Sequence, residues 1–112
     1  MVSYVPKQGD IVVIDFNPSK GREQQGKRPA LIISNEKYHR RTGLLIVSPI
    51  SNTPNQFPMH IKLEDNLTTK GVVLTQHIRT IDPVARSVIF VESVSEDFRD
   101  YIVKIVGLCF TN

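Results

Sequence analysis

At 112 residues the chain has room for one domain around one hydrophobic core, and we expect a single domain over residues 1–112. Its 40% apolar and 22% charged residues argue against general disorder, and no apolar run approaches the roughly 20 residues of a membrane helix. The net charge of +3 decides little, but the single Cys109 excludes an internal disulfide. The N-terminus carries no apolar secretory signal. This and the single cysteine favour a cytoplasmic location for the protein.

Short β-branched runs with a period of two recur along the chain, which is typical of half-buried strands. In one of them apolar Met59, Ile61 and Leu63 alternate with polar His60 and Lys62, so only one face should be buried. Strands are predicted at residues 11–16, 30–34, 44–47, 59–63, 71–81 and 88–91.

A helix is predicted at the C-terminal end, where apolar residues recur at helical spacing. Its apolar stripe consists of Phe98, Ile102, Ile105, Val106 and Cys109, and we expect Cys109 to be buried. Ser93 or Ser95 is the expected N-cap, and Ser93 has capping-box spacing with Glu96. Several short strands followed by one helix indicate a mainly β fold, a small antiparallel barrel with a C-terminal α-helix packed on it.

Charge is distributed unevenly along the chain. Four cations with only Glu23 in opposition fall within nine residues, namely Lys20, Arg22, Lys27 and Arg28. The charged residues at 92–100 are mainly acidic, with only Arg99 in opposition. This distribution predicts one side of the protein that faces a polyanion.

Two connections, residues 17–28 and 51–58, are longer than a hairpin needs and are expected to carry binding residues. The sequence contains no HExxH, CxxC, P-loop or GxGxxG pattern, and its carboxylates do not cluster. Metal-dependent proteolysis and nucleotide-dependent phosphoryl transfer therefore have no support, and we expect neither a metal nor a cofactor.

Arg28 is the residue best placed for chemistry. It stands where a polar loop bracketed by Gly21 and Gly26 becomes a strand, directly before Pro29, which is tolerated at the first strand position. A guanidinium held in this way can donate two hydrogen bonds to a phosphate. The alternative is an arginine that only solubilises the start of the strand.

The segment around Arg28 resembles the signature of the MazF/PemK family of toxin endoribonucleases. The matching runs are Gly9–Ile11, Phe16–Pro18, Gly21–Ala30, Ser48–Ser51, Gly71–Leu74 and Ile78–Asp82, so the resemblance spans essentially the whole chain.

The resemblance implies an SH3-like antiparallel barrel of the MazF/PemK/CcdB type that forms a homodimer. It implies metal-independent, sequence-selective cleavage of single-stranded RNA, including mRNA, by attack of the 2′-hydroxyl, leaving a 2′,3′-cyclic phosphate and a 5′-hydroxyl. It also implies growth inhibition, and neutralisation by a cognate antitoxin whose disordered segment covers the RNA groove. No membrane contact follows from it, and DNA contact is expected only for the toxin–antitoxin complex.

Site residues follow from the same resemblance. Arg28 matches the catalytic arginine of the family, and Ser51 matches its catalytic threonine or serine. Glu23 matches a loop residue that shapes the site, and Glu23 or His77 is expected to transfer protons. The residues expected to contact RNA are Phe16, Lys20, Arg22, Gln24, Gln56, Phe57, Gln76 and Arg79.

The chain departs from the family pattern at Gln76 and His77, where relatives carry an acidic residue and then glutamine. A regular strand at 71–81 would place Val73, Thr75, His77 and Arg79 on one face. His77 could then act as general acid or base, bind a base edge, or lie at a dimer surface.

Two other classes of function compete with the ribonuclease. One is a non-catalytic toxin that binds a protein target, as CcdB-like toxins do, although this chain lacks the C-terminal tryptophan often found there. The other is an inactive RNA-binding or regulatory module of the same barrel fold.

Overall fold

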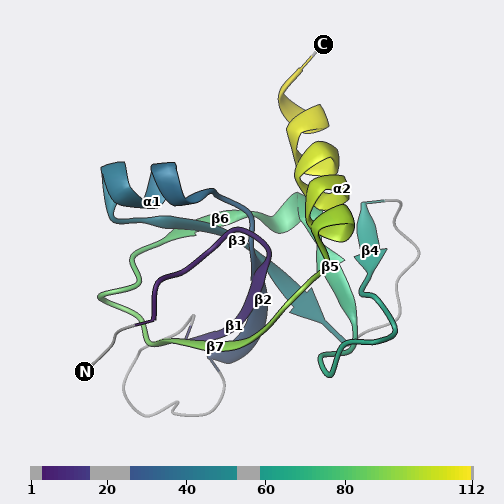
Figure 1. The fold of residues 1–112 in the computed structure, drawn as a ribbon, viewed down its shortest axis with the longest axis horizontal. Helices are drawn as coiled ribbons and strands as arrows, with labels where there is room; N and C mark the ends of the chain where they lie inside the picture. The colour runs from purple at the N-terminus through teal and green to yellow at the C-terminus, as the bar shows by residue number, and fades with distance from the viewer. Residues whose placement is uncertain (1–3, 16–25, 53–58, 112) are drawn as a thin grey trace.

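The computed structural model describes residues 4–15, 26–52 and 59–111. The elements are β1 (Asp10–Asp15), β2 (Lys27–Ile32), α1 (Glu36–Thr42), β3 (Leu45–Ser51), β4 (His60–Lys62), β5 (Val72–Leu74), the 3-10 turn η1 (Thr75–His77), β6 (Arg79–Ile81), β7 (Val88–Ser93), α2 (Glu96–Gly107) and the 3-10 turn η2 (Leu108–Phe110). The predicted fold class is confirmed, because these residues form an antiparallel, barrel-like sheet with one C-terminal helix against it (Figure 1). None of the helices in these three ranges is long and apolar enough to cross a membrane.

The strands are hydrogen-bonded in the order β4-β5-β3-β2-β1-β7, and β6 also pairs with β3. β3 is the strand on which the sheet bends, because Leu45–Val47 pair with β6 whereas Ile50 and Ser51 pair with β5. All pairings between these strands are antiparallel.

Two apolar clusters lie on the two sides of this sheet. The first packs under α2 and includes Ile11, Leu31, Ile50, Leu63, Val73, Ile102 and Val106. The second consists of Val12, Ile14, Ala30, Ile32, Leu45, Val47 and Ile81, with Tyr4 and Val88 against it. Successive residues of a strand point to opposite faces, so each of β1, β2 and β3 contributes to both clusters.

Two carboxylates link the outer strands of the open sheet. Glu92 on β7 accepts hydrogen bonds from the backbone N–H groups of Thr68 and Thr69, which lie between β4 and β5. Glu64 accepts from the backbone and hydroxyl of Ser95 at the start of α2. These side chains hold the two edges of the sheet together without a continuous ladder of backbone bonds.

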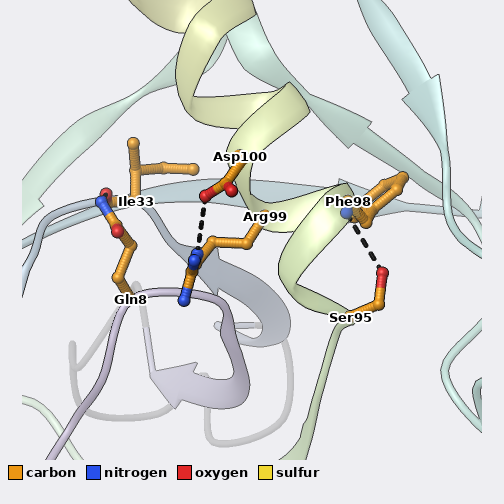
Figure 2. A network of polar contacts seen from close by, with 6 residues as sticks. All are labelled: Gln8, Ile33, Ser95, Phe98, Arg99 and Asp100. Carbon is orange, nitrogen blue, oxygen red and sulfur yellow. Dashed lines mark hydrogen bonds and ion pairs between the residues drawn. The ribbon is translucent and has the colours of Figure 1, made fainter.

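The N-terminus of α2 is capped by Ser95, whose hydroxyl accepts a hydrogen bond from the Phe98 N–H (Figure 2). Glu96 and Asp97 stand in the first turn, as predicted, where negative charge is favourable. The capping-box expectation for Ser93 was wrong, because β7 continues through that residue.

Three other expectations need correction, and one helix was missed. The predicted long strand at 71–81 is broken by η1, because β3 changes its register between β6 and β5. β2 begins at Lys27, so Pro29 lies inside the strand, where β2 pairs with β3 only from Ala30 onward. Helix α1 was not predicted. Cys109 lies in η2 and is exposed, because the helix has ended before it.

Candidate functional site

Arg28 and Ser51 lie on neighbouring strands and on the same side of the sheet. β2 and β3 are paired from Ile32–Val47 to Ala30–Pro49. Arg28 stands two residues before Ala30 on β2, and Ser51 stands two residues after Pro49 on β3. Both therefore project to the side that carries Ala30, which we call the Arg28 face. Arg28 is exposed and Ser51 is half-buried, so this face offers a cation beside a hydroxyl.

Gly71 fixes how closely β5 approaches Ser51. A Cβ at Gly71 would lie 2.4 Å from the Ser51 carbonyl oxygen, and the glycine has a φ of +126° that other residues rarely adopt. Val72, the next residue, pairs with Ser51. The glycine thus permits the backbone contact that positions Ser51.

The prediction that His77 and Arg79 lie on one face of a regular strand is wrong. Thr75 is buried, with its hydroxyl donating to the Met59 carbonyl, whereas Gln76 and His77 are exposed on η1. The 3-10 turn destroys the alternation on which that expectation depended. Arg79 follows in β6, exposed and paired with Val47 on the Arg28 face.

His77 instead contacts His60, which is not among the predicted site residues. The two ring centroids are 6.3 Å apart and the rings stand at 87°, an edge-to-face contact between η1 and β4. The signal for His60 and Lys62 was available, because both are the polar members of the alternating strand at 59–63.

The remaining sequence-predicted site residues lie outside the described part of the chain. They are Phe16, Lys20, Arg22, Glu23, Gln24, Gln56 and Phe57.

A second polar cluster surrounds Asp10, which is only 5% exposed. Its carboxylate accepts hydrogen bonds from the Tyr4 and Ser93 hydroxyls and from the Lys7 N–H. Burial and the contact with Asp10 raise the pKa of Tyr4 far above its usual range, so the phenol remains a donor. The hydrogen bonds of this cluster hold the N-terminal segment against β7 and do not supply a proton-transfer group. A pocket of about 340 Å³, which Phe90 also lines, adjoins the cluster.

Chemically, the Arg28 face suits a phosphodiester. A guanidinium can stabilise negative charge on phosphate oxygens, and a hydroxyl beside it can donate one further hydrogen bond. The opposite side of the same strands packs Leu31 and Ile50 into the apolar core beneath α2.

Comparison with known proteins shows a family match and similar curated proteins. Residues 7–109 match the family described as PemK-like, MazF-like toxins of type II toxin–antitoxin systems. The endoribonuclease toxin MazF of Escherichia coli K12 is 37% identical over 82 residues, covering 72% of this chain and 73% of that protein.

Solved structures of similar fold are also found. MazF from Deinococcus radiodurans superposes with a TM-score of 0.81 at 32% identity, over 96% of this chain and 97% of the other. A MazE–MazF structure from the same organism gives 0.83 at 30% identity, over 95% and 96% of the two chains.

Proposed function

The chain belongs to the family of PemK-like, MazF-like toxins of type II toxin–antitoxin systems, and from this we propose that it is an endoribonuclease that cleaves single-stranded RNA on its Arg28 face. The endoribonuclease toxins MazF and ChpB of Escherichia coli are similar over more than two thirds of their lengths, which supports this activity. The observation that carries the proposal is the position of Arg28 and Ser51 on neighbouring strands and on one side of the sheet.

In the proposed reaction the ribose 2′-oxygen attacks the adjacent phosphorus and the bond from phosphorus to the 5′-oxygen breaks. The products are a 2′,3′-cyclic phosphate and a 5′-hydroxyl. Arg28 donates two hydrogen bonds to the phosphorane oxygens, and the Ser51 hydroxyl donates one to a non-bridging oxygen. Glu23 or His77 takes the proton of the 2′-hydroxyl and returns a proton to the 5′-oxygen. Ser51 forms no covalent bond, because the 2′-oxygen is the nucleophile.

The direct test is incubation of the purified protein with a long single-stranded RNA in EDTA, followed by mapping of 5′-hydroxyl ends. We expect discrete cuts without metal. Intact RNA at high protein concentration would exclude the ribonuclease and favour a non-catalytic, CcdB-like toxin.

Arg28→Ala should lower the cleavage rate by about 10²–10³-fold, the usual effect of removing one preorganised donor. Lys27→Ala is the matched control, because Lys27 is the adjacent exposed cation and projects to the opposite side of β2. Equal losses in both variants would mean that charge alone, and not the position of Arg28, supports cleavage.

We further propose two protein partners. A cognate antitoxin would cover the Arg28 face, consistent with the toxin–antitoxin family and with the MazE–MazF structure of a relative. A second copy of the chain would associate at β7, an edge strand that leaves Ile89, Phe90 and Val91 exposed. Light scattering should give a dimer mass that Ile89→Lys lowers toward the monomer, and an unchanged mass would remove β7 from the interface.

A further inference from the structure

The register of four strands carries the Arg28 face beyond Ser51. Ser51 of β3 pairs with Val72 of β5, and Val72 pairs with Lys62 of β4. Extending the β2–β3 register by two residues brings Arg28 opposite Ser51, so Arg28 continues this row. Cross-strand partners point to the same side, so Lys62 lies on the Arg28 face.

Packing on the other side supports this orientation. Ile50, Ile61 and Val73 alternate with the residues of that row, and all three contact the apolar core beneath α2. Lys62 consequently points away from the core, and its side chain is 78% exposed. Its ion pair with Asp65, at 3.4 Å with both side chains exposed, is of the weak kind that a phosphate can replace.

The distance between β2 and β4 decides whether Lys62 and Arg28 can bind the same phosphate. Three strand spacings separate β2 from β4, which is about 14 Å between backbones. Side chains that stand perpendicular to the sheet at that separation do not share one phosphate. Arg28 and Lys62 therefore fit two different phosphates of one chain that crosses the strands.

An aromatic pair borders the same end of the row. His60 precedes Lys62 by two residues on β4 and so projects to the same side, where its ring meets that of His77. In an edge-to-face pair His60 covers at most one face of the His77 ring. The His77 side chain is exposed, and an exposed ring can stack a base.

We propose that the RNA runs across β2, β3, β5 and β4, with Lys62 binding a backbone phosphate beyond Ser51 and the His60–His77 pair stacking a base beside it. This path rests on the proposed ribonuclease function. It makes Lys62 a binding residue and gives His60 the role of positioning the His77 ring.

The test uses a fluorescein-labelled, random-sequence 2′-O-methyl RNA, which cannot be cleaved because its 2′-oxygens are blocked. Anisotropy titrations between about 50 and 200 mM KCl give the slope of log affinity against log salt. Lys62→Gln should reduce the magnitude of that slope by about 0.7, the value for one phosphate contact in a single strand. Lys104→Gln, at an exposed lysine of α2, should leave the slope unchanged.

The histidine pair is tested with the same probe and with unmodified RNA. His60→Ala and His77→Ala should weaken binding by roughly 5- to 100-fold, as loss of a stacked base does, and should raise KM more than they lower kcat. His60→Phe and His77→Phe keep an aromatic ring and should restore most of the binding.

The outcomes separate this path from the ribonuclease itself. An unchanged salt slope in Lys62→Gln, or an equal reduction in Lys104→Gln, would overturn the path while wild-type cleavage continues. A loss of kcat with unchanged binding in His77→Ala would also overturn it and would leave His77 as a proton-transfer group. A wild-type protein that neither binds nor cleaves RNA would overturn the proposed function.

Discussion

Replacing Gly71 by alanine tests whether the backbone position of Ser51 controls cleavage. The new Cβ would lie 2.4 Å from the Ser51 carbonyl oxygen and 3.0 Å from its carbon, whereas ordinary contacts begin at 3.4 Å. Both neighbours are backbone atoms, so β3 and β5 must separate by about 1 Å. A shift of about 1 Å in a reacting geometry can cost about 10²-fold in rate.

The substitution also has a cost in stability. A side chain at a φ of +126° strains the backbone by roughly 1–3 kcal/mol, which should appear as a lower free energy of unfolding. Single-turnover cleavage of RNA in EDTA measures the first effect, and thermal unfolding followed by circular dichroism measures the second.

Gly43→Ala is the matched control. Gly43 ends α1 with a φ of +75°, and a Cβ there would meet no atom within 4 Å. Gly43→Ala should therefore lose about 1 kcal/mol of stability and keep the wild-type cleavage rate. If folded Gly71→Ala cleaves as fast as Gly43→Ala, the link between the Ser51 backbone and cleavage is refuted.

Three further predictions concern the frame that supports the site. Ile102→Ala removes a fully buried side chain between α2 and the sheet, and chemical denaturation should show a loss of about 2–5 kcal/mol; a loss below about 1 kcal/mol would mean that α2 contributes little. Hydrogen bonds from the side chain and backbone of Thr69 lower the pKa of Glu92, so this carboxylate stabilises the fold above its unfolded pKa and loses that effect as pH falls through its folded value. Glu92→Gln should thus melt below wild type at pH 7 and approach it at acid pH, and a difference that does not change with pH would contradict the ionic role. The fully buried Ser48 hydroxyl has no hydrogen-bond partner within the described ranges, so Ser48→Ala should raise the unfolding free energy by about 1 kcal/mol, and a loss of that size would show that the hydroxyl is satisfied.

Local patterns were sufficient where one segment carries its own signal. The alternation at residues 59–63 and the helical stripe from Phe98 correspond to β4 and α2. Helix α1 has no buried residue and so no apolar periodicity, but its boundaries had a readable signal in the Asn35 cap and in Gly43.

Patterns failed where distant segments decide the conformation. The run at 71–81 has the composition of one strand, yet β3 pairs with β5 and β6 in two different registers. The residues between them must form η1, where Thr75 turns inward to bond Met59. That constraint comes from residues distant in the sequence, so no local propensity records it.

By itself the sequence determined the family, the β-rich barrel with its terminal helix, and Arg28 as the residue around which the signature is built. Only the tertiary structure decided that Arg28 stands with Ser51 and Lys62 on one side of the sheet and that His60 meets His77. The physical reason is that strand register and sheet bending depend on pairing between segments far apart in the chain, whereas residue patterns report only on near neighbours.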